Sequence, residues 1–247
     1  MPKEKILQTN QLLISKALNW TPSINQIEKF TKLQLLLRDW NRKTNLTRLT
    51  EGNDFWIGQV IDSLWPLKKE LQNSQTSCKI IDVGSGCGLP GLAIAIALPN
   101  SSLTLVDSIN RKTIAIKNIA EGLGLTSRVN VINKRIELLG QDSSYRNSFD
   151  LSLARAVASS EIVAEYLIPF LNNIGEALIY KGKWTFDEQR KLKKALILLK
   201  GEINQIQRFD LPENKGTRHI IRVKCLEKCP EKYPRGIGIP NKKPLGT

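Results

Sequence analysis

The chain has 247 residues, which is long enough for one sizeable hydrophobic core with a small appended subdomain. Its apolar content of 41% excludes an intrinsically disordered chain, and no stretch reaches the roughly 18 apolar residues that a membrane-spanning helix needs. Lysine and arginine number 37 against 23 acidic residues, and this net charge of +14 favours a polyanion such as nucleic acid as partner over a merely basic enzyme.

The N-terminus predicts the compartment, and the cysteines argue against disulfides and a metal site. Residues 1–5 alternate in charge and contain no apolar signal region, so a cytoplasmic protein is expected. The four cysteines are too few and too irregularly spaced for a disulfide framework: Cys78, Cys87, Cys225 and Cys229. Only one histidine, His219, accompanies them, so no zinc or other metal site is predicted.

The first part of the chain is predicted to be helical. Apolar residues recur at helical spacing over residues 23–40, and Ser23 is a suitable N-cap. Together with the amphipathic run before it, this pattern predicts an N-terminal helical subdomain over residues 1–71. The polar residues 72–77 then predict a linker.

Short apolar runs alternate with helical stretches over residues 78–228. Strands are predicted at 79–83, 103–106, 129–132, 151–154, 176–180, 203–209 and 219–225, and helices at 92–98, 110–123, 162–171 and 187–199. This alternation predicts an α/β fold, a parallel sheet with helices on both faces. The last two strands have no helix between them, so they predict an antiparallel hairpin at one edge.

The tail, residues 229–247, holds four prolines and several lysines. It is predicted to form no regular element. Either it is a disordered tail, or it is a basic strap that lies on the protein surface or on a partner.

A glycine-rich loop carries the sharpest functional signal, in Ile-Ile-Asp-Val-Gly-Ser-Gly-Cys-Gly-Leu-Pro-Gly over residues 80–91. Three alternate glycines let the backbone turn tightly and let a ligand approach it. Gly86 also begins a formal G-x-G-x-x-G pattern, so a nicotinamide dinucleotide or a turn without ligand are the alternatives. Asp82 disfavours a pyrophosphate but attracts the sulfonium and ammonium of S-adenosyl-methionine, which we therefore predict as the cofactor.

Three further segments follow strands of the predicted sheet. Asp107, about 20 residues after the glycines, can accept both ribose hydroxyls of a nucleoside. Residues 135–137 follow the third strand where the adenine would lie, although an ordinary capping segment explains them equally well. Arg155 follows the fourth strand as a fixed cation at the mouth of the site, with a buried structural ion pair as the alternative.

The residues after the fourth strand also limit the reaction. The Asn/Asp-Pro-Pro-Tyr pattern typical of amino-group methyltransferases is absent, and Cys229 with Pro230 lies too late in the chain for C5-pyrimidine methylation. Guanine N7 carries an in-plane lone pair and needs no prior deprotonation, so positioning beside the methyl donor suffices. The chain is compatible with that target.

The chain resembles a known family in motifs that run through most of its length. They are Trp40-Asn41, Asn45-Leu46-Thr47, Asp62-Ser63-Leu64, Asp82 to Gly91, Asp107-Ser108, Arg155-Ala156, Lys181-Gly182, Arg218-His219 and Tyr233-Pro234-Arg235. On these residues it is similar to the bacterial 16S rRNA guanine-N7 methyltransferases, also called glucose-inhibited division protein B. One departure is Gly58-Gln59, where family members carry Arg-His, so RNA contacts there must use other residues.

The resemblance implies a class I, Rossmann-like methyltransferase that acts on 16S rRNA or the small ribosomal subunit, and we expect a monomer. The implied cofactor-binding residues are Asp82, Gly84, Gly86, Leu89, Asp107, Ser108, Ile109, Ile136, Glu137 and Arg155, and Arg155 is also the expected catalytic residue. The implied RNA-binding residues are Arg48, Lys181, Arg218 and His219. A methyltransferase of another RNA or of protein, and a non-catalytic RNA-binding module, are the alternative functions.

Overall fold

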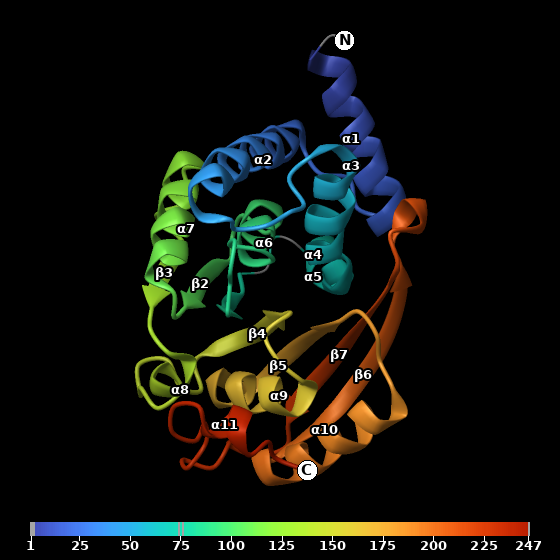
Figure 1. Ribbon diagram of the computed structural model, residues 1–247. Coiled ribbons are helices and arrows are strands. Elements are labelled where there is room, and N and C mark those ends of the chain that lie inside the picture. Colours follow the sequence, from blue (N-terminus) through green and yellow to red (C-terminus); the bar gives the residue numbers. More distant parts are fainter. Residues whose placement is uncertain (1–2, 74, 76, 247) are drawn as a thin grey trace.

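The computed structural model describes residues 3–73, 75 and 77–246. This part of the chain holds a seven-stranded sheet in the order β3-β2-β1-β4-β5-β7-β6 (Figure 1). The strands are β1 (Lys79–Val83), β2 (Ser102–Asp107), β3 (Val129–Asn133), β4 (Phe149–Arg155), β5 (Leu171–Lys181), β6 (Gly201–Asp210) and β7 (Thr217–Cys225). β1 to β5 are parallel, whereas β7 pairs antiparallel with both β5 and β6. The predicted parallel sheet with a C-terminal antiparallel hairpin is confirmed.

The N-terminal region is helical, as predicted. It comprises α1 (Lys3–Leu18), α2 (Ile24–Thr44), α3 (Gly52–Phe55), the π-helical turn η1 (Trp56–Ile61), α4 (Asp62–Leu64), the 3-10 turn η2 (Trp65–Leu67) and α5 (Lys68–Gln72). The predicted cap is formed, because Ser23 Oγ accepts from Gln26 N at 3.2 Å and Ser23 N donates to Gln26 Oε1 at 2.8 Å. Of the predicted linker, residues 74 and 76 lie outside the described residues.

Helices cover both faces of the sheet (Figure 1). α6 (Gly91–Ala97) and α7 (Asn110–Gly122) lie on one face with α2, and α9 (Ser160–Leu167) and α10 (Phe186–Leu199) lie on the other. Neighbouring strand residues therefore face different cores: Ile80 belongs to the first apolar cluster and Ile81 to the second. Phe30 of α2 packs in the same cluster as Ile80, so the helical region shares the sheet's core.

The C-terminal end of α9 lies earlier than predicted. The helix ends at Leu167 rather than at residue 171, a 3-10 turn η3 (Ile168–Phe170) follows, and β5 begins at Leu171. Pro169 is the physical reason, since proline has no N–H to donate to the preceding helical turn.

The tail is packed against the protein. Tyr233 and Leu245 are buried among residues of α9 and α10, so the alternative of a strap on the protein surface is the one observed. The prediction that it forms no regular element was wrong for one turn, α11 (Ile239–Lys242). None of the helices in the described ranges is long and apolar enough to cross a membrane.

Candidate active site

Two adjoining cavities lie at the carboxyl edge of the sheet, where open α/β sheets bind ligands. The larger has a volume of about 740 Å³ and the smaller about 330 Å³, and both are lined by Gly84, Lys112 and Ala156. We call them the large cavity and the small cavity. Of the predicted site residues, the large cavity is lined by Gly84, Gly86, Leu89, Arg155, Lys181, Arg218 and His219, and the small cavity by Gly84, Asp107, Ser108, Ile109 and Ile136.

The glycine loop forms the boundary between the two cavities. Gly84 and Gly86 adopt the left-handed region, with φ of +70° and +59°. A Cβ on Gly84 would lie 2.7 Å from Cγ2 of Val157, so only glycine leaves this wall unstrained. The loop is also tied to β2, because Gly84 N donates to the carbonyl of Val106 at 2.8 Å.

Asp107 lies at the end of β2 and lines the small cavity. Its Oδ2 accepts from Gly86 N at 2.9 Å and its Oδ1 accepts from Ile109 N at 2.8 Å. Each carboxylate oxygen keeps further acceptor capacity, because an ionised carboxylate offers about four lone-pair sites. The residue can therefore hold the loop and still accept two sugar hydroxyls.

Asp82 lies behind the loop and lines neither cavity, with only 1% of its surface exposed. Its Oδ2 accepts from Gly91 N at 2.9 Å, while Oδ1 has no hydrogen-bond partner. Burial raises the pKa of this carboxyl to about 7. Asp82 therefore supports the loop from behind and does not contact a ligand from the cavity wall.

Glu137 is also turned away from the cavities. Its side chain is fully buried, and its Oε1 accepts from Arg135 Nη2 at 2.8 Å and from Gly238 N at 3.0 Å. Ile136, beside it, lines the small cavity. Of the predicted pair Ile136 and Glu137, only Ile136 lines a cavity.

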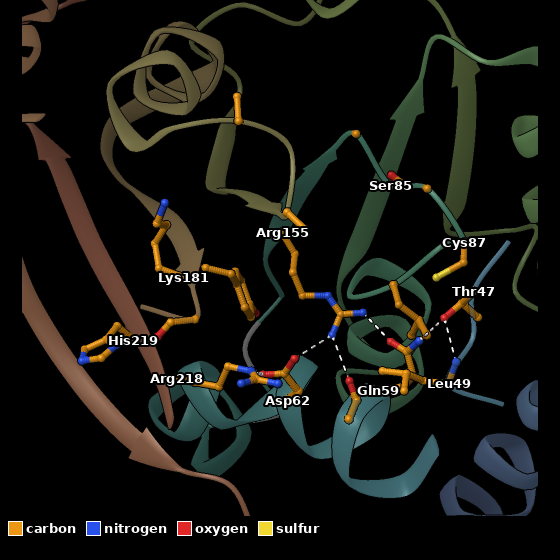
Figure 2. A pocket seen from close by; sticks show the side chains of 18 of the residues that line it. Thr47, Leu49, Gln59, Asp62, Ser85, Cys87, Arg155, Lys181, Arg218 and His219 are labelled. Carbon is orange, nitrogen blue, oxygen red and sulfur yellow. Dashed lines mark hydrogen bonds and ion pairs between the residues drawn. The ribbon is translucent and has the colours of Figure 1, made fainter. Parts of the chain in front are cut away.

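Arg155 extends from the end of β4 into the large cavity, where Figure 2 shows it pointing toward Asp62 and Gln59. Its Nη1 donates to Asp62 Oδ2 at 3.1 Å, and its Nη2 donates to Gln59 Oε1 at 2.5 Å. Asp62 also accepts from Arg218 Nε at 3.1 Å. Arg155 is thus both a partly buried ion-pair partner and part of the cavity wall. The structural ion pair and the placement of a cation at the cavity are therefore compatible with each other.

Gln59 joins this network to the loop after α2. Its Nε2 donates to Thr47 Oγ1 at 2.9 Å. The position where the chain departs from the usual Arg-His pair is therefore occupied by a residue that braces Arg155 from the facing helical segment. Nothing in the sequence pattern indicated the pairing of Asp62 or Gln59 with Arg155.

Basic side chains line the large cavity. Lys181 and His219 are among the residues that line it (Figure 2). Lys181 Nζ forms an ion pair with Glu188 at 2.7 Å. Arg48 is exposed and does not line the cavity, although its neighbours Thr47 and Leu49 do.

Lys112, Tyr166 and Asn241 are among the cavity-wall residues that were not predicted as site residues. Lys112 lines both cavities, and Tyr166 and Asn241 line the small one. Only Lys112 had a usable sequence signal, since it lies at the start of the helix that follows Asp107.

Residues 26–221 match the family described as GidB, rRNA small subunit methyltransferase G. The chain belongs to this family. It is 56% identical to a ribosomal RNA small subunit methyltransferase G of Prochlorococcus marinus, over 100% of this chain and 98% of the relative. It is 54% identical to the protein of the same name in a Synechococcus species, over 93% of this chain and 90% of that one.

The fold is that of class I methyltransferases. The O-methyltransferase of Bacillus cereus, solved with S-adenosyl-homocysteine, superposes with a TM-score of 0.55 at 12% identity, over 78% of this chain and 90% of that one. The predicted family, Rossmann-like fold, enzyme class and S-adenosyl-methionine dependence are confirmed by these findings together. The dinucleotide and ligand-free interpretations of the glycine loop are thereby set aside.

Proposed function

We propose that the protein transfers a methyl group from S-adenosyl-methionine to N7 of a guanine in 16S ribosomal RNA. The observation that carries this proposal is the pair of adjoining cavities that meet at Gly84. The small cavity presents the carboxylate of Asp107 to a nucleoside, and the large cavity is wide and lined by basic side chains. A methyl donor and a nucleobase can then meet at the glycine loop.

The small cavity fits the adenosine part of the cofactor. Asp107 supplies two acceptor oxygens for the ribose hydroxyls, and Ile109 and Ile136 supply apolar surface for the adenine ring. The methionine end would lie along Gly84 and Gly86, where left-handed glycines leave the backbone open. When bound, S-adenosyl-methionine supplies an electrophilic methyl group on a sulfonium.

The large cavity fits the target base. Guanine N7 attacks with its own lone pair, so the protein has to orient the base and exclude water rather than remove a proton. Arg155, held by Asp62 and Gln59, is a fixed cation in the cavity wall that can orient the purine. Cys87 also lines the cavity, but burial raises the pKa of its thiol, so it stays protonated and is a poor nucleophile.

The basic rim fits the RNA backbone. We propose that Lys181, Arg218 and His219 contact phosphates or sugars near the target base, and that Arg48 extends this surface beyond the cavity. A net charge of +14 supports this assignment, because neutralising phosphates releases counterions. We further propose that the protein acts as a cytoplasmic monomer.

Transfer of tritium from labelled S-adenosyl-methionine tests the proposal. Naked 16S rRNA, small ribosomal subunits, transfer RNA and a protein substrate are offered in parallel, and N7-methylguanine is mapped by chain cleavage. Label at a single guanine of 16S rRNA is expected. Label only in transfer RNA or protein would overturn the proposed substrate and would favour the alternative methyltransferase functions.

A further inference from the structure

The C-terminal strap, residues 229–246, is held to the protein by hydrogen bonds and a buried ion pair. Arg146 donates to the carbonyl oxygens of Tyr233 at 2.6 Å and Cys229 at 2.7 Å. Arg235 pairs with Glu165 at 2.7 Å, and the Glu165 side chain is fully buried. This ion pair defines the position of the strap, because releasing it would leave a buried charge unpaired.

The middle part of the strap lies beside the small cavity. Gly238 N donates to Glu137 Oε1 at 3.0 Å, which attaches the strap beside Ile136. Three residues further on, Asn241 lines the cavity, and its Nδ2 donates to Tyr166 Oη at 2.8 Å. The strap therefore contributes Asn241 to the lining of the cavity that Asp107 also lines.

After their mutual hydrogen bond, Tyr166 still has a proton to donate and Asn241 still has a carbonyl oxygen that can accept. Tyr166 accepts through Oη, so its proton is free to be donated, and burial raises its pKa to about 12, which keeps the hydroxyl protonated. The carbonyl oxygen Oδ1 of Asn241 is an acceptor. Among the described residues, no protein group accepts from the Tyr166 hydroxyl or donates to Asn241 Oδ1.

We propose that the strap completes the cofactor site and selects a 6-aminopurine. Adenine carries a donor at the N6 amine beside an acceptor at N1, and this pair matches the Asn241 carbonyl and the Tyr166 hydroxyl. A 6-oxopurine reverses both groups, with an acceptor at O6 and a donor at N1, so it would leave both protein groups without partners. The proposal rests on the adenosine placement given under the proposed function.

The test measures binding rather than turnover. Dissociation constants of the full-length protein for S-adenosyl-homocysteine and for its 6-oxo analogue, S-inosyl-homocysteine, are measured by titration calorimetry. The wild type should prefer the 6-amino ligand. Asn241→Ala should reduce the ratio of the two dissociation constants about three- to tenfold, which is the contribution of one neutral hydrogen bond. Most of the change should come from weaker binding of the 6-amino ligand. Tyr166→Phe, which keeps the ring, should do the same.

The matched control is Asn118→Ala, which removes another exposed asparagine whose amide donates one hydrogen bond, on a helix surface outside both cavity linings. Thermal unfolding by circular dichroism establishes that each variant is folded. An unchanged preference in both Asn241→Ala and Tyr166→Phe, with affinity lost in Asp107→Ala, would overturn the strap proposal alone. Full affinity in all three variants would overturn the adenosine placement as well.

Discussion

Replacing Arg155 by alanine separates its ion-pair role from its role in the reaction. The change removes the donor to Asp62 and Gln59. Breaking a buried ion pair from one side costs about 3–5 kcal/mol. Because Asp62 keeps Arg218 as a partner at 3.1 Å, we expect a smaller loss, about 2–3 kcal/mol of unfolding free energy.

That loss of stability is too small to imitate a catalytic defect. Even a protein with only about 5 kcal/mol of stability that loses about 3 kcal/mol stays about 97% folded. A misplaced reactant, in contrast, can slow a reaction about a hundredfold. We therefore expect kcat for methyl transfer to fall about ten- to hundredfold in Arg155→Ala.

Single-turnover methyl transfer at saturating cofactor, with urea unfolding of the same samples, measures both effects. Arg218→Ala is the matched control, because it removes the other cation bound to Asp62 and its side chain is more exposed, at 29% against 16%. It should raise KM for RNA more than it lowers kcat. A normal kcat in Arg155→Ala, at whatever stability, would refute a role of this residue in the reaction.

Further variants test the loop and its carboxylates. Asp107→Ala should weaken cofactor binding at least tenfold by calorimetry, since hydrogen bonds to a charged group contribute about 1.5–3 kcal/mol each. RNA binding in filter assays should stay unchanged. An equal loss of cofactor and RNA affinity would contradict the placement of Asp107 in the cofactor site. Gly84→Ala should lower the urea midpoint, because the left-handed φ and the clash with Val157 together cost about 1–3 kcal/mol of unfolding free energy. Adding Val157→Ala to this variant should restore only the part of the loss that the clash causes. Asp82→Asn should change the pH dependence of stability. The pKa of Asp82 in the folded protein, about 7, lies above the ordinary value, so the folded state binds the proton more tightly than the unfolded state. The unfolding free energy of the wild type should therefore fall by about 2 kcal/mol relative to the variant between about pH 5.5 and 8, and by almost nothing more above that. A difference that does not change with pH would argue against a buried, titrating Asp82.

Elements with strong local signals were predicted closely. β1 spans the predicted residues 79–83, and the Ser23 cap begins α2 as predicted. Both follow from short-range physics: β1 carries Ile80, Ile81 and Val83, the apolar residues of a buried strand, and a capping box lies within four residues. The start of β5 was less accurate, because residues 171–175 show no apolar alternation. Of these residues only Leu171 pairs with β4, opposite Phe149, and the register shifts before the pairing resumes at Glu176.

The functional loop was predictable for a similar reason. Alternate glycines after a strand have few structural uses, and the next strand ended in a carboxylate at the expected spacing. The orientation of Asp82 and Glu137 was not predictable. Both carboxylates turn away from the cavities, toward backbone N–H groups at Gly91 and Gly238 that only the folded chain brings near.

The sequence by itself determined the strand–helix order, the glycine loop, Asp107 and the family, because these depend on neighbours within a few residues or on motif identity. Tertiary structure alone decided the pairing of Arg155 with Asp62, 93 residues apart, and the return of Asn241 to Tyr166, 75 residues apart. Such contacts are selected by the packing of whole helices and strands around a shared core, and no local propensity encodes which distant partner a side chain will meet.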